Sequence, residues 1–104
     1  MNIKWSFLAI ESLDNICDHL SSQFGVKAKS DFLTAVDKSI KQVAQYPNIG
    51  IVEQSLAADG SVHSILVNRL SKFIYYVEDD ELFIADVWDI RQNPETLATR
   101  FTKQ

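Results

Sequence analysis

The sequence has little of the residues that cross-link or interrupt a chain. Of its 104 residues, three are glycine, two are proline and only one, Cys17, is cysteine. One cysteine excludes an internal disulfide framework and a cysteine-based metal site, and it fits a reducing compartment. Scarce glycine and proline argue against long flexible segments. We therefore expect one folded domain over residues 1–104, a length that buries roughly two-thirds of its unfolded surface.

Long hydrophobic runs and an excess of positive charge are also missing. No apolar stretch approaches the roughly 20 residues of a membrane-spanning helix, and the N-terminus has no apolar signal-peptide core. We therefore expect a cytoplasmic protein. Ten lysines and arginines stand against fourteen aspartates and glutamates, for a formal net charge of −4. Because binding a nucleic-acid backbone usually takes a basic face, this balance favours other partners, although it allows a local basic patch.

Helical periodicity dominates the first half of the sequence. Ser6 offers the hydroxyl of an N-terminal helix cap, and apolar residues then recur every three or four positions up to Phe24. Gly25 favours termination of this helix. A second apolar stripe covers residues 32–44 and cannot continue through Pro47. Because the two segments are nearly contiguous, they predict an antiparallel helical hairpin.

Strand signals dominate the second half. Residues 47–60 predict a loop with a short extended piece near Ile51–Glu53. Three runs rich in β-branched and aromatic residues, separated by short polar turns, predict an antiparallel meander: Val62–Asn68, Lys72–Glu78 and Leu82–Trp88. The tail predicts a last short helix or an extended arm over Glu95–Phe101.

A short strand at Ile3–Trp5 is expected to join an edge of that sheet. The order is then β-α-α-β-β-β. It predicts an α+β fold in which the N-terminal strand and the helical hairpin pack on a small antiparallel sheet.

Residues for catalysis are sparse, and we predict no cofactor and no metal. The sequence has no phosphate-binding glycine loop and no nucleophile elbow, and two histidines cannot by themselves complete a zinc site. His19 falls beside the first apolar stripe, where a surface role is expected. His63, on a strand, can transfer protons near neutral pH, although a solvent-facing strand histidine is the plainer interpretation. Tyr75 and Tyr76 are adjacent and so point to opposite faces of the sheet; each either packs in the core or offers a ring for base stacking.

Cationic residues gather near the predicted strand ends. Arg69 and Lys72 flank the turn between two strands, and Arg91 follows the last strand. Strand ends on one side of a sheet can converge, so these side chains can form a small cationic cluster for phosphates or a carboxylate-rich partner. The alternative is that they are solvated turn charges or pair within the chain with Asp86 and Asp89.

The order of these features resembles the RelE/ParE superfamily, the toxins of bacterial type II toxin–antitoxin systems. The resemblance extends from about residue 3 to residue 97. The following segments carry it: Trp5-Ser6 with Ala9, Leu13 and Ile16; the second helix ending before Tyr46-Pro47-Asn48-Ile49-Gly50; Leu66–Asn68 with Phe73–Val77; and the run from Ile84 to Pro94.

The resemblance implies two different mechanisms. RelE-like members are ribosome-dependent mRNA endonucleases, which need cations on the scissile phosphate and a group that activates the 2′-hydroxyl. Those roles would fall here to Arg69 and Arg91, with His63 or Tyr75 as proton carriers. ParE-like members instead bind DNA gyrase and need an interaction surface.

The sequence departs from the ribonuclease pattern. Residues 52–61 contain no lysine or arginine, Asp89 stands where many relatives have a histidine, and no tyrosine follows Arg91. Asp86 and Asp89 would also disfavour a nearby phosphate. We therefore predict a ParE-like toxin that binds a protein target such as DNA gyrase. A cognate antitoxin would form a hetero-oligomer with it, across the helical hairpin or the open sheet face. The alternatives are a RelE-like endonuclease and a non-toxic binding module on the same fold.

Overall fold

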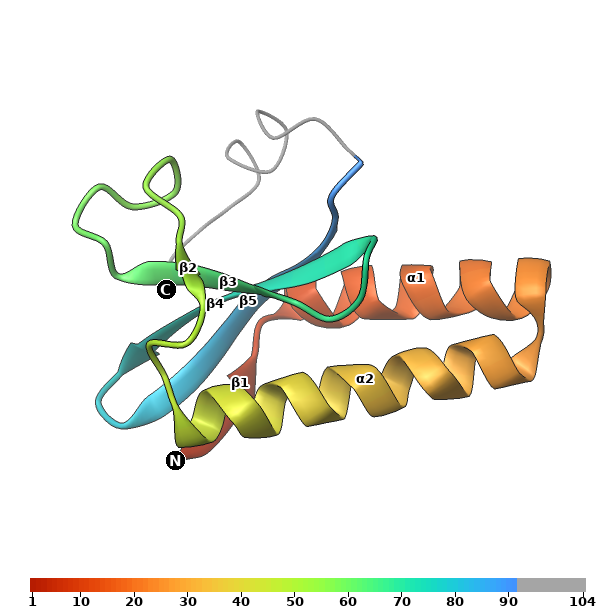
Figure 1. Ribbon diagram of the computed structural model, residues 1–104, viewed down its shortest axis with the longest axis horizontal. Coiled ribbons are helices and arrows are strands. Elements are labelled where there is room, and N and C mark those ends of the chain that lie inside the picture. Colours follow the sequence, from red (N-terminus) through yellow and green to blue (C-terminus); the bar gives the residue numbers. More distant parts are fainter. Residues whose placement is uncertain (92–104) are drawn as a thin grey trace.

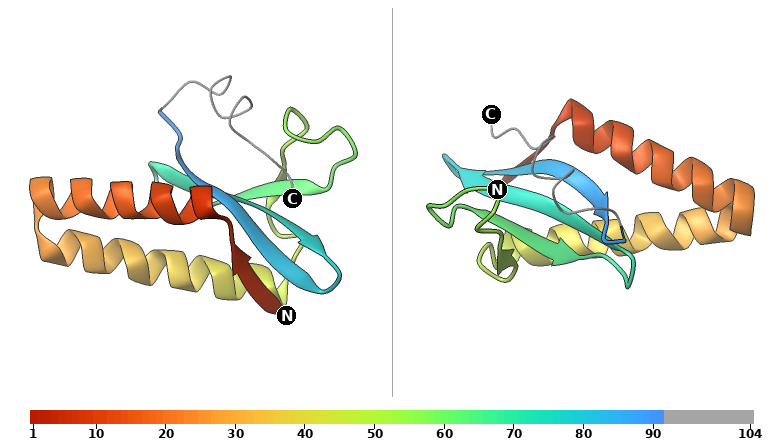
Figure 2. Two further views of the ribbon diagram at one scale, coloured as in Figure 1. Left: turned by 180° about the vertical axis from the view of Figure 1, so that it is seen from behind. Right: turned by 90° about the horizontal axis from the view of Figure 1, so that it is seen from above.

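The protein combines one mixed sheet with a helical hairpin that covers one of its faces (Figures 1 and 2). The structure is a computed structural model and describes residues 1–91. Its elements are β1 (Asn2–Trp5), α1 (Phe7–Phe24), α2 (Val26–Gln45), β2 (Ile51–Val52), β3 (Val62–Leu66), β4 (Ser71–Glu78) and β5 (Glu81–Asp89). The predicted α+β fold is confirmed. The expectation for Glu95–Phe101 falls outside the described residues.

The sheet has five strands in the order β1-β5-β4-β3-β2. Strands β2 to β5 pair with antiparallel neighbours, which confirms the predicted meander and adds the two-residue strand β2 at one edge. Strand β1 forms the other edge and runs parallel to β5, with Ile3 opposite Leu82 and Trp5 opposite Ile84. Parallel strands need a long crossover connection. In this chain the helical hairpin, which follows β1 in the sequence, is part of that connection.

The helical hairpin turns on a single residue. Ser6 caps α1, since its Oγ accepts a hydrogen bond of 2.9 Å from the backbone N–H of Ala9. Gly25 then has φ +93°, a left-handed conformation that glycine adopts without strain, and α2 begins directly after it. The second helix therefore starts at Val26, well before its apolar stripe. Neither helix within residues 1–91 has the length and apolarity needed to cross a membrane.

Hydrogen bonds tie the first turns of α1 to β5. Strand β1 covers the edge of β5 only as far as Ile84. There the backbone N–H of Ser6 donates to the carbonyl of Ile84 at 3.0 Å, and its Oγ donates to the carbonyl of Ala85 at 2.8 Å. Six residues after Ser6, Ser12 Oγ donates to Asp86 Oδ1 at 2.7 Å. Helix α1 therefore takes over from β1 as the neighbour of β5.

A bulge in β5 makes this contact possible. Ile74 of β4 lies opposite Asp86 while the next residue, Tyr75, lies opposite Ile84, so that β5 has one residue more than its partner here. The Asp86 side chain is fully buried, and its Oδ1 also accepts from the backbone N–H of Val87 at 2.8 Å. Bonds from both Ser12 and Val87 compensate part of the cost of burying this carboxyl group.

Apolar side chains pack on both faces of the sheet. On the hairpin side, Phe73 and Tyr75 join residues of both helices in one cluster. On the other side, Ile74, Tyr76 and Trp88 form a second cluster with side chains of the 53–61 loop. Tyr75 and Tyr76 therefore point to opposite faces, as predicted. Both are buried, so neither offers an open ring for base stacking.

Tyr75 anchors the segment that leaves α2. Its hydroxyl donates to the carbonyl of Pro47 at 2.8 Å and accepts from the backbone N–H of Gly50 at 3.0 Å. A Cβ at Gly50 would stand 2.6 Å from both this hydroxyl and the carbonyl of Ser64, so the close approach requires glycine. Burial raises the pKa of the Tyr75 phenol, although the Gly50 bond opposes the shift. At neutral pH the hydroxyl therefore remains protonated and keeps its bonds to Pro47 and Gly50.

An ion pair joins the loop to the central strands on the face opposite the helices. Lys72 Nζ lies 2.7 Å from Glu53 Oε2, and Ser64 Oγ donates to the same oxygen at 2.6 Å. Burial disfavours the charged carboxylate, but the bonds from Lys72 and Ser64 and the charge of Lys72 outweigh it, so the pKa of Glu53 is lowered. Lys72 is therefore engaged in the fold and does not join a cluster with Arg69 and Arg91.

Removing the Tyr75 hydroxyl should destabilise the protein. Tyr75→Phe leaves the Pro47 carbonyl and the Gly50 N–H without their partner, which should lower the free energy of unfolding by about 1–3 kcal/mol. The matched control is Tyr46→Phe, because Tyr46 is exposed and should change it by less than about 0.5 kcal/mol. Urea unfolding measures both; equal values would show that the Tyr75 bonds do not anchor this segment.

Removing the Ser6 hydroxyl should loosen α1 from β5. Ser6→Ala loses the cap on Ala9 and the bond to Ala85, and we expect a loss of about 1–3 kcal/mol in the free energy of unfolding. Ser22→Ala is the control, since among residues 1–91 the exposed Ser22 hydroxyl bonds only to the carbonyl of His19 in the same helix. A Ser6 variant as stable as the Ser22 variant would contradict the anchoring role.

The Glu53–Lys72 pair should make stability depend on pH. Because the folded pKa of Glu53 lies below its ordinary value of 4.5, the unfolded state binds more protons, and stability falls as pH drops through the folded pKa. Lys72→Met should lower the free energy of unfolding most at neutral pH. The difference in this free energy between the variant and wild type should become smaller below about pH 4.5.

Urea unfolding over a pH series measures this effect. The control is Lys41→Met, which removes an exposed pair with Asp37 and should leave the pH profile close to that of wild type. A constant difference between wild type and Lys72→Met at every pH would contradict the expected coupling.

Candidate functional site

The helical hairpin extends past the ends of the strands (Figure 1). A groove opens between the hairpin and those strand ends. It has a volume of about 400 Å³ and is formed by α1, α2, the β3–β4 turn and the end of β5. Its apolar lining comes from Ile16, Leu20, Phe32, Leu70 and Val87. Its polar lining includes Asn15, His19, Asn68, Asp89 and Arg91. An apolar concavity with a few polar groups at its edge is typical of a binding site.

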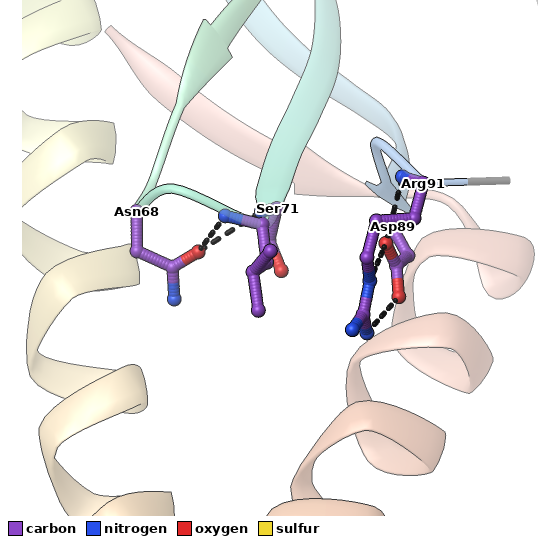
Figure 3. A network of polar contacts seen from close by, with 5 residues as sticks. Asn68, Ser71, Asp89 and Arg91 are labelled. Carbon is purple, nitrogen blue, oxygen red and sulfur yellow. Dashed lines mark hydrogen bonds and ion pairs between the residues drawn. The ribbon is translucent and has the colours of Figure 1, made fainter.

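The β3–β4 turn presents Asn68 to the groove. Its Oδ1 accepts hydrogen bonds from the backbone N–H groups of Leu70 and Ser71, at 2.8 and 2.9 Å. This side-chain turn is a common use of asparagine, and it leaves the amide nitrogen pointing into the space between the two helices (Figure 3). The backbone N–H of Ile90 donates to the Leu70 carbonyl at 2.9 Å and holds the end of β5 beside the turn.

Arg91 stands across the groove from Asn68 (Figure 3). Its guanidinium donates to Asp89 through Nε at 3.1 Å and Nη2 at 2.8 Å, and its backbone N–H donates to Asp89 Oδ1 at 2.9 Å. The side-chain bond from Arg91 has the largest effect on the pKa of Asp89 and lowers it. The backbone bond from Arg91 acts in the same direction, and partial burial opposes both. The expected pairing of Arg91 with a nearby aspartate is therefore present, whereas Asp86 bonds instead to Ser12.

The other predicted site residues lie in different places. Arg69 is exposed in the β3–β4 turn and forms no hydrogen bond or ion pair with the described residues. His63 is half-buried on β3 and stacks on Tyr75, with ring centroids 5.6 Å apart. Tyr75 lies four residues along β4 from Ser71, the partner of Asp89, a separation of about 13 Å along the strand. The fold therefore brings Arg69 and Arg91 to one end of the sheet and keeps His63 and Tyr75 away from them.

The sequence does not identify two of the residues that line the groove. The sequence predicts a surface role for His19 and a place at the end of a strand for Asn68, whereas the structure places both at the groove. The Asn68–Ser71 spacing is a recognisable signal for a side-chain turn, but nothing in the sequence tells that the helices extend past it. Among residues 1–91, no three histidine, cysteine, aspartate or glutamate side chains are grouped to hold a metal ion.

Comparison by sequence finds no relative, since no family model and no curated protein matches the chain. Comparison of structures does find similar chains. A chain of the chromosomal ParDE TA system from P. aeruginosa has a TM-score of 0.70 and 22% identity, covering 86% of this chain and 95% of that one.

Two further solved structures share the fold at lower similarity. The YoeB dimer from Staphylococcus aureus has a TM-score of 0.59 and 18% identity, over 83% of this chain and 92% of that one. The YoeB/ParE toxin from Agrobacterium tumefaciens has a TM-score of 0.59 and 12% identity, over 86% and 98%. The arrangement of the helical hairpin and sheet in this protein is therefore the RelE/ParE-like toxin fold that its sequence resembles.

Proposed function

We propose that the protein is the toxin of a bacterial type II toxin–antitoxin system. The observation that carries this proposal is the fold shared with ParE and YoeB chains over most of the length of both partners. Within that class we favour a ParE-like toxin, which acts in the cytoplasm by binding a protein target such as DNA gyrase. Such a toxin would act through a binding surface and would need no catalytic residues.

The charges at the groove favour binding over cleavage of RNA. A ribonuclease needs cations free to stabilise charge that develops on a phosphate. Two donor groups of Arg91 are already bonded to Asp89, whose carboxylate would repel a phosphate placed there. The Tyr75 hydroxyl is engaged by Pro47 and Gly50. A protein surface, by contrast, can use a guanidinium that is held in place by a neighbour.

A cognate antitoxin is the partner that this proposal requires. One of the similar structures is the YoeB–YefM complex from Staphylococcus aureus, and another is a YoeB–YefM toxin-antitoxin heterotetramer. By analogy, we propose a hetero-oligomer between this protein and a small protein encoded beside it. That partner would block the surface used on the cellular target.

The second candidate is a RelE-like, ribosome-dependent mRNA endonuclease. One observation favours it: Arg69 and Arg91 are both exposed at the same end of the sheet, where they can contact phosphate. In that case Arg69 and Arg91 would bind phosphate, and His63 or Tyr75 would carry the proton. A non-toxic binding module on the same fold is the third possibility.

Induced expression in a bacterial host distinguishes these functions. We expect growth arrest with a DNA-damage response while protein synthesis continues, and we expect co-expression of the neighbour-encoded protein to restore growth and to co-purify. Arrest of translation with cleavage of ribosome-bound mRNA, lost in Arg91→Ala, would replace the ParE-like assignment with the endonuclease.

Two controls make the assay decisive. Circular dichroism should show that Arg91→Ala folds, since the Arg91 side chain is 64% exposed. Normal growth on expression of the wild-type protein alone, in a host without the neighbour-encoded protein, would contradict both toxin assignments.

A further inference from the structure

We propose that the protein forms a symmetric dimer in which β1 pairs antiparallel with β1 of a second copy, about a two-fold axis at Ile3. The sheets of the two copies would then form one continuous sheet across the axis. This inference goes beyond the proposed function and does not rest on it. It is carried by the open backbone edge of β1, the alternation of its side chains and the charges beside it.

The backbone of β1 directs bonding groups away from the sheet. Within residues 1–91, β1 lies at one edge of the sheet (Figure 2) and has β5 as its one neighbouring strand. The N–H of Ser6 donates to the carbonyl of Ile84 in β5, and backbone groups alternate in direction along a strand. The N–H and C=O of Lys4 therefore point toward β5, and those of Ile3 and Trp5 point outward. Such an edge is a template for pairing with another chain.

This alternation selects the position of the axis. Residues that exchange both N–H···O bonds in an antiparallel pair lie directly opposite each other. With the axis at Ile3, each Ile3 lies opposite its own copy and Trp5 lies opposite Met1, so that outward groups meet outward groups. An axis at Lys4 would place two ammonium groups opposite each other, which is destabilising. A shift by one residue would set Ile3 against Lys4, whose backbone groups already bond to β5.

The apolar side chains of β1 match across this axis. Ile3 and Trp5 lie on the hairpin face, where their partners in β5 are Leu82 and Ile84 of the apolar cluster beneath the helices. Met1 and Ile3 are 43% and 39% exposed. The axis would place Met1 against Trp5 of the second copy and the two Ile3 side chains against each other. Apolar surface of both copies would thereby be removed from water.

The charges on the other face of β1 are complementary across the axis. Residues 78–81 are all acidic, and the Nζ of Lys4 lies 3.7 Å from Glu81 Oε2. In the dimer, Lys4 of the second copy lies opposite Asn2, which is itself opposite Glu81. Cβ atoms of opposite residues are about 4.5–5.5 Å apart, so a lysine side chain can reach Glu81 across Asn2. Each acidic turn therefore gains the positive charge of a second lysine.

Sedimentation equilibrium of the full-length protein tests the inference. We expect the mass of a dimer at about 100 μM and dissociation on dilution. Ile3→Glu sets two carboxylates against each other at the axis and should raise the dimer Kd at least about tenfold. The matched control is Ile51→Glu, at an exposed position of the edge strand β2, which should change the Kd by less than about twofold. Circular dichroism checks that both variants fold.

A cysteine at the axis gives a second test, which decides the matter if Ile3→Glu does not fold. Hydrogen-bonded residues directly opposite in an antiparallel pair have Cα atoms about 5.5 Å apart, a separation that a disulfide can span. With oxidised glutathione as the oxidant, the Ile3→Cys variant should form a disulfide-linked dimer and the Ile51→Cys variant should not. The wild-type protein controls for Cys17, which is buried.

A monomer at concentrations up to about 1 mM would overturn the inference. A dimer whose Kd is equal in Ile3→Glu and Ile51→Glu would do the same, as would equal rates of disulfide formation at both positions. If the protein alone is monomeric and the protein encoded beside it slows hydrogen exchange at residues 2–5, the edge serves that protein and not a second copy. These measurements are made without cells, so a monomer would leave the toxin assignment standing, and a dimer of a harmless protein would refute the toxin assignment alone.

Discussion

The contact between the start of α1 and the end of β5 determines how the rest of the molecule is arranged. Ser6 bonds to Ile84 and Ala85, and Ser12 bonds to Asp86, just where β1 stops covering the strand. A strand edge without a partner would leave backbone groups without hydrogen bonds. Beyond the end of β1, Ser6 donates hydrogen bonds to the carbonyls of Ile84 and Ala85 on this edge. Because α1 is fixed at its N-terminal end, the rest of the hairpin extends past the sheet (Figure 2). The groove is the space that this extension leaves.

The two ends of the molecule are built differently. Near β2, the Tyr75 hydroxyl, Gly50 and the Glu53–Lys72 pair tie the loop after α2 to the sheet through buried or half-buried bonds. At the groove, the bonds of Asn68 and Arg91 are local and exposed, and they orient the side chains without enclosing them. Interactions of the first kind stabilise a fold, and those of the second kind prepare a surface for binding.

The sequence predicted the features that depend on neighbouring residues. The Ser6 cap, the turn at Gly25, the opposite faces of Tyr75 and Tyr76 and a pair between Arg91 and a nearby aspartate all follow from local chemistry. The bond from Ser12 to Asp86 joins residues far apart in the sequence and needs the bulge at Ala85, which has no clear sequence signal. The groove also was not predictable, because it depends on where the helices lie relative to the β3–β4 turn.

The central claim is that this groove is where a protein partner binds. Hydrogen–deuterium exchange of the full-length protein, alone and in complex with the protein encoded beside it, tests this claim most directly. We predict that the complex protects the backbone at residues 15–20, 68–71 and 87–91. Protection confined to the outer face of α1, or to the β2 edge at Ile51–Val52, would contradict it, as would the absence of any complex.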